Sequence, residues 1–108
     1  MSGRDRRRGD AATWLVRALT RDAAAAGVAL VVDGMDSHAW ASATFEGEQC
    51  RLTLAASPAD AARRWLDRLD EAELPMTGHV AMPPAIDAVR TASEALVAEL
   101  CVLVLVDG

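Results

Sequence analysis

Apolar residues recur at helical spacing in two segments of the chain. The first segment spans residues 11–26, and its apolar stripe comprises Trp14, Leu15, Ala18 and Leu19. The second begins at Ser57-Pro58, and its stripe comprises Ala61, Trp65, Leu66, Leu69 and Ala72. Gly27 and Pro75 follow the two stripes and are typical of helix ends. The pattern therefore predicts two amphipathic helices.

Other segments have the pattern of β-strands. Residues 28–32 and 39–45 are rich in apolar side chains, and whether they form one bent strand or two stays open. Residues 49–55 alternate apolar with polar, which predicts a half-buried strand after a turn at residues 46–48. Residues 78–82 predict a further strand, which Pro83-Pro84 interrupts.

Two halves of the sequence align when one is shifted by about 51 residues. About a dozen of ~45 aligned positions are identical, where an Ala-rich composition gives roughly four or five by chance. Trp14 then falls on Trp65, and Cys50 falls on Cys101. We interpret the halves, residues 11–56 and 61–107, as pseudo-repeats that place both indoles in equivalent core positions.

Residues 85–100 support two interpretations. Their Ala, Glu and Leu content favours a helix. The repeat instead predicts a hairpin, and we follow the repeat because tertiary context often overrides propensity. The ungapped repeat places the hairpin turn at Val97–Ala98, whereas turn chemistry favours Thr91–Glu94. The predicted fold class is then α+β in the order α-β-β-α-β-β, with a four-stranded antiparallel sheet and two helices on one face.

Composition sets the size and class of the protein. The 108 residues are 52% apolar and 25% charged, which suits one globular domain over residues 11–108. Residues 1–10 carry four arginines and no apolar side chain after Met1, so we expect a disordered Arg-rich arm. The net charge of -5 makes nucleic acid an unlikely partner. Frequent Ala, Arg, Val and Asp are typical of a bacterial source.

Missing residue types exclude several chemistries. The chain has no Lys, so it has neither a Schiff-base lysine nor a P-loop lysine. Two cysteines are too few for a disulfide framework. We see no signal peptide, and the apolar runs at residues 23–32 and 100–106 are too short to span a bilayer. We therefore expect a cytoplasmic protein without a membrane partner.

Few side chains are candidates for catalysis or metal binding. Cys50 and Cys101 are either a redox pair or small core residues, and the second interpretation is favoured. His38 and His79 lack the spacing of metal ligands and are better explained as turn residues. Four carboxylates could supply an acid–base pair, but solvated loop and edge positions are favoured for them: Asp33, Asp36, Asp87 and Glu99.

The remaining candidates have ordinary explanations as well. No nucleophile motif surrounds the strand hydroxyls Ser42, Thr44 and Ser93. The arm residues Arg4, Arg6, Arg7 and Arg8 could contact phosphate, although a solvated tail is favoured. We expect no catalytic site, no cofactor and no metal.

Association is the function that this pattern favours. A two-layer fold leaves one sheet face bare, and a second copy usually covers such a face. The possible interface comprises Trp40, Cys101, Leu103 and Leu105. The predicted element order resembles ferredoxin-like dimer domains of some bacterial secretion and pilus assembly proteins, which implies a homodimer. Two alternatives are a small-molecule binder or minor enzyme at a dimer cleft, and a nucleic-acid-associated protein using the Arg arm.

Overall fold

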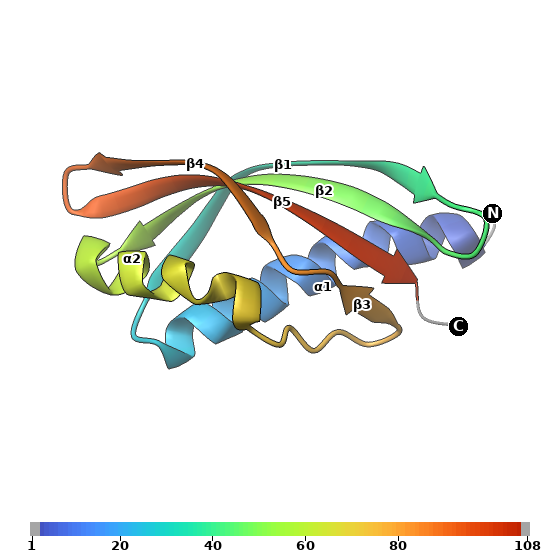
Figure 1. The fold of residues 1–108 in the computed structure, drawn as a ribbon, viewed down its shortest axis with the longest axis horizontal. Coiled ribbons are helices and arrows are strands. Elements are labelled where there is room, and N and C mark those ends of the chain that lie inside the picture. Colours follow the sequence, from blue (N-terminus) through green and yellow to red (C-terminus); the bar gives the residue numbers. More distant parts are fainter. Residues whose placement is uncertain (1–2, 107–108) are drawn as a thin grey trace.

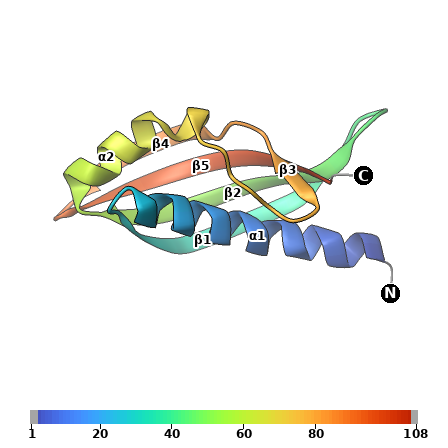
Figure 2. The same ribbon diagram turned by 90° about the horizontal axis from the view of Figure 1, so that it is seen from below.

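The protein is a two-layer α+β domain. The computed structural model describes residues 3–106, with side chains from residue 11 onward. Its elements are α1 (Gly3–Ala25), β1 (Ala29–Ala41), β2 (Glu46–Ser57), α2 (Ala59–Asp67), the 3-10 turn η1 (Leu69–Glu71), β3 (His79–Ala81), β4 (Ala85–Ala92) and β5 (Ala95–Val106). Figures 1 and 2 show both helices on one face of a single sheet, which confirms the predicted class and layering.

The sheet has five antiparallel strands, so the predicted count of four is wrong. Its order is β1-β2-β5-β3, and β4 also pairs with β5. β3 pairs with β5 at residues 104–106, whereas β4 pairs with it at residues 95–101. Two short strands therefore share one edge of β5, because Pro83-Pro84 separates them.

Side chains alternate between the two faces of the sheet along β2 and β5, and those on the helix side form the core. Their even-numbered side chains face the helices and are buried: Cys50, Leu52, Leu54 and Ala56 on β2, and Leu96, Ala98, Leu100, Val102 and Val104 on β5. The helices bury Ala11, Leu15, Leu19 and Ala23 from α1, and Ala62, Trp65 and Leu66 from α2. The odd-numbered residues of β2 and β5 lie on the opposite side of the sheet, which we call the open face.

β1 is one bent strand rather than two. Its register against β2 shifts between Val32 and Gly34, so Asp33 occupies a β-bulge. The turn that follows spans residues 42–45 and not the predicted 46–48. The Oγ of Ser42 accepts the N–H of Phe45 at 3.0 Å, and the Ser42 N–H donates to the Phe45 carbonyl at 2.7 Å. Ser42 therefore organises this turn.

Residues 85–100 form a hairpin, as predicted. β4 and β5 meet at Ser93-Glu94, and Ser93 has a φ of 56°. The turn lies within Thr91–Glu94, the stretch that turn chemistry favours, and not at Val97–Ala98, where the ungapped repeat places it. Pairing with β5 therefore overrides the helix propensity of this segment.

The repeat is not confirmed. A shift of 51 residues places Cys50, Leu52 and Leu54, which face the helices, over Cys101, Leu103 and Leu105, which lie on the open face. Even-numbered residues face the helices in both β2 and β5, so an odd shift matches each of them with a residue on the opposite face. The two indoles also differ, because Trp65 is buried whereas Trp14 is half-buried beside the guanidinium of Arg17, 5.6 Å from the ring centre.

The first helix begins earlier than predicted. α1 starts at Gly3 instead of near Ala11, so its backbone runs through the segment assigned to a disordered arm. The side chains of the four arm arginines lie outside those that the structure describes. Within residues 3–106, no helix combines the length and the apolar character needed to cross a bilayer.

Candidate functional site

The open face brings together the four residues predicted as an interface. Trp40 of β1 lies opposite Gly47, which lies opposite Leu105. Leu103 and Cys101 follow on the same side of β5, two and four residues before Leu105. All four predicted side chains are half-buried and have no helix above them. Whether they contact a partner stays a prediction.

Two further apolar side chains extend this end of the face. Val80 of β3 lies opposite Leu105 and is 48% exposed. Met82, 41% exposed, continues the register, because its N–H donates to the Leu103 carbonyl at 2.8 Å. Neither residue was among the predicted interface residues, although both lie in the strand predicted at residues 78–82, two residues apart and therefore on one side.

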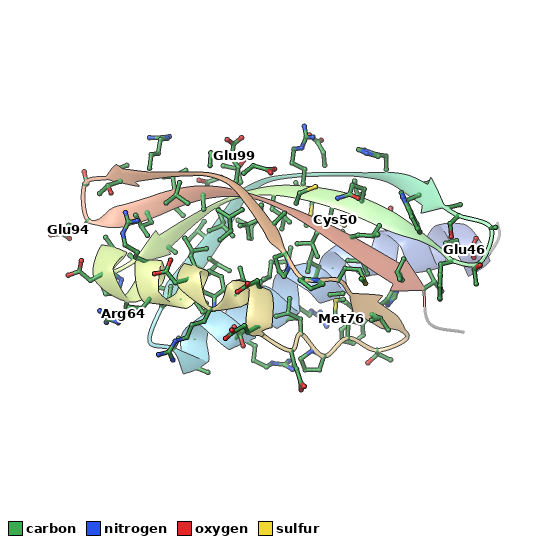
Figure 3. The ribbon with its side chains drawn as sticks, in the orientation of Figure 1. Glu46, Cys50, Arg64, Met76, Glu94 and Glu99 are labelled. Carbon is green, nitrogen blue, oxygen red and sulfur yellow. The ribbon has the colours of Figure 1, made fainter. Side chains whose placement is uncertain are left out.

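The middle of the open face is polar. Asp36 lies opposite Arg51, and Arg51 lies opposite Cys101. The Nε2 of Gln49 lies 2.6 Å from the Cys101 Sγ. Glu99 projects from this side of the sheet, away from the helices (Figure 3). This surface is an ordinary wet sheet face at its centre and is apolar towards the β3 end.

The two thiols point to opposite faces of the sheet. Cys50 faces the helices opposite Val102, whereas Cys101 lies on the open face opposite Arg51. Burial raises the pKa of the Cys50 thiol from 9.0 to about 11, with smaller contributions from Glu48 and Cys101. Both cysteines are free. A buried thiol with a raised pKa is a poor nucleophile, so this geometry favours the core interpretation over a redox pair.

The two histidines do not converge. His38 is exposed on the open face opposite Gln49, whereas His79 is buried on the helix side with its Nδ1 2.8 Å from the Thr77 carbonyl. A pocket of about 450 Å³ beside His79 contains neither His38 nor Cys101. Among residues 11–106, no group of three or more His, Cys, Asp or Glu side chains is placed to hold a metal ion.

The carboxylates and hydroxyls are dispersed. Asp33 and Asp87 lie at β-bulges, where the registers of β1 and β4 shift. Asp36 and Glu99 both lie on the open face, but β2 separates their strands. The candidate hydroxyls Ser42, Thr44 and Ser93 are turn residues. No two of the candidate carboxylates form an acid–base pair.

A groove between the helices was not predicted. It has a volume of about 610 Å³, and its polar lining comprises Asp22, Arg64, Arg68 and Glu71. At its base the Trp65 Nε1–H donates to the Asp22 Oδ2 at 2.8 Å. Two acids and two bases balance, so the groove has no charge preference for a ligand.

The strand β4 is the least covered element of the sheet. Seven of its eight residues are exposed, and Ala92 is half-buried. Ile86 and Val89 lie opposite Leu100 and Ala98 on the helix side, yet they are 39% and 40% exposed. The sequence pattern does not single out these two residues, because their exposure at the edge depends on where α2 packs.

Comparisons with protein-family models, with curated proteins and with solved structures find no match to this chain. The likeness to ferredoxin-like dimer domains therefore stays an expectation drawn from element order.

Proposed function

We propose that this chain is a small non-enzymatic association module that acts as a homodimer, with the sheet as the contact layer. The main support for this proposal is the position of the large hydrophobic side chains that stay exposed. Among the described side chains there are six, and all belong to the sheet or its adjoining turns: Val31, Phe45, Val80, Met82, Ile86 and Val89. The helices carry none of them.

This distribution favours a partner that contacts the sheet layer, because Val80 and Met82 lie on the open face and Ile86 and Val89 lie on the β4 edge. A partner that covers apolar surface stabilises the complex by about 25 cal/mol for each Å² that it removes from water. Grouped apolar side chains on a small domain mark contact sites more often than isolated ones do. A second copy is the partner that requires no other component, and twofold dimers are the commonest assemblies. The proposal includes a cytoplasmic bacterial setting, consistent with two unpaired cysteines.

Sedimentation equilibrium over a wide concentration range tests the dimer. We expect a mass twice the 11.4 kDa of one chain at micromolar concentration. We also expect the urea midpoint to rise with protein concentration, because association stabilises the folded state by mass action. A single-chain mass at every concentration, with a constant midpoint, would overturn the proposal.

A further inference from the structure

The outer edge of β4 has unpaired backbone and little cover. Within the described residues β4 pairs only with β5, so its other side presents free N–H and C=O groups. Natural sheets usually protect such an edge with charges or a covering element. Here seven of eight residues are exposed, and the only charged ones are Asp87 and Arg90.

The helix side of β4 leaves apolar area in water. Ile86 and Val89 face the helix layer, but α2 packs on β2 and β5. α2 has nine residues and is about 14 Å long, whereas the eight residues of β4 extend about 27 Å. The short helix therefore covers the edge strand only in part, and Ile86 and Val89 stay 39% and 40% exposed. Figure 2 shows α2 and β4 at the same margin of the sheet.

The opposite edge is protected against self-pairing. Both edge strands carry an acid at a bulge, Asp33 on β1 and Asp87 on β4, but β1 has a second acid in Asp36 and contains no arginine. Two β1 strands placed side by side would bring acids together without an arginine to neutralise them. β4 differs, because it carries one acid and one base three residues apart. Antiparallel self-pairing of β4 about Val89 then brings Arg90 of each copy within one residue of the partner's Asp87, at two symmetric positions, whereas parallel pairing in register would oppose like charges.

We propose that β4 pairs antiparallel with β4 of a second copy, about a twofold axis that passes near Val89. The two sheets join into one, and both helix layers lie on the same side of it. Val89 then meets Val89 of the partner on the helix side. Arg90 then lies opposite the partner's Ala88, the residue next to the partner's Asp87 in the chain. This inference rests on the proposed function, since it specifies where the two copies of the homodimer meet.

The open face is the other candidate for this contact. Its apolar end holds Trp40, Leu105 and Val80, but Asp36, Arg51 and Glu99 occupy its middle. A face-to-face dimer would have to bury these charges, which is costly unless each finds a partner. Edge pairing leaves them in water. The charge pattern therefore favours the edge.

Two single charge reversals and their mixture test the edge. Arg90→Glu places two acids together at both symmetric positions, and Asp87→Arg places two bases together. Each variant alone should raise the dimer dissociation constant by about tenfold or more. An equimolar mixture should regain a dimer, because every new acid then meets a base. Both residues are exposed, so both variants should fold.

Two controls separate the possible outcomes in sedimentation. Arg64→Glu makes the same charge change on the helix layer and should leave the dimer intact, as should Val80→Glu on the open face. The edge pairing would be overturned, and the homodimer kept, if neither β4 reversal weakened the dimer. The same conclusion would follow if Val80→Glu alone dissociated it. A wild-type chain that stays monomeric would overturn the proposed function itself.

Discussion

At the scale of single residues, Gly47 shows how closely the strands approach. It lies in β2 opposite Trp40 on one side and Leu105 on the other. An added Cβ would overlap the Val104 carbonyl oxygen and lie 2.9 Å from the Leu105 Cα. Both groups are backbone of the central strand β5, which cannot move aside easily. The sequence pattern suggested a turn here, but packing is what requires a glycine at this position.

Substitution of Gly47 should therefore destabilise the domain. We expect Gly47→Ala to lower the free energy of unfolding by about 1–3 kcal/mol, the usual cost of overpacking a core. Gly34→Ala is the matched control, since its Cβ would lie 3.9 Å from the Thr53 Cβ, an ordinary contact. Urea unfolding at one fixed protein concentration measures both. Equal effects of the two substitutions would contradict this account.

At the scale of elements, the sequence predicts what depends on local periodicity. The two helices follow from the stripes around Leu15 and Leu66, and β2 follows from the alternation of Cys50 with Arg51. The hairpin at residues 85–100 needed a non-local argument, because its own residues favour a helix. The repeat supplied that argument, but it assigned the wrong sheet face to the residues of β5. Side chains alternate along a strand, and the offset of 51 matches inward residues of β2 with outward residues of β5.

The candidate site was predictable only in part. The sequence placed Trp40 and Leu105 on a sheet surface, and the structure puts them on the same open face. Alternation within each strand was enough for that. The exposure of Ile86 and Val89 could not be predicted, because it depends on the length and position of α2 in the folded chain.

A single side-chain hydrogen bond joins the two helices in the described part of the chain. The Trp65 indole of α2 donates to the Asp22 carboxylate of α1 at 2.8 Å. Trp65→Phe keeps the aromatic packing but removes the donor, which leaves a half-buried carboxylate without this partner. We expect a loss of about 1–2 kcal/mol in the free energy of unfolding, measured by urea denaturation.

Trp14→Phe provides the comparison for this indole. Trp14 is half-buried on α1 beside Arg17, where a phenyl ring can still lie next to the guanidinium. Its substitution should therefore cost less than that of Trp65. If Trp14→Phe were the more damaging change, the two indoles would not differ in the way their surroundings indicate.

At the scale of the whole molecule, the folded state should hold one proton that the unfolded chain releases in alkali. Burial raises the pKa of the Cys50 thiol from 9.0 to about 11. The stability that this proton provides is fully present below pH 9 and is lost as pH rises through 11. The free energy of unfolding should therefore fall by about 1.4 kcal/mol per pH unit across this window.

Composition makes this titration unusually clean to measure. The chain has no Lys and no Tyr, so the two thiols are the only side chains whose ordinary pKa lies near this range. Urea unfolding from pH 8 to 10.5, with a reductant and at fixed protein concentration, should show the fall in the wild type. Cys50→Ala should abolish most of it, whereas Cys101→Ala, on the opposite face, should keep it. An equal slope in the wild type and Cys50→Ala would mean that the buried thiol ionises as readily in the folded chain as in the unfolded one.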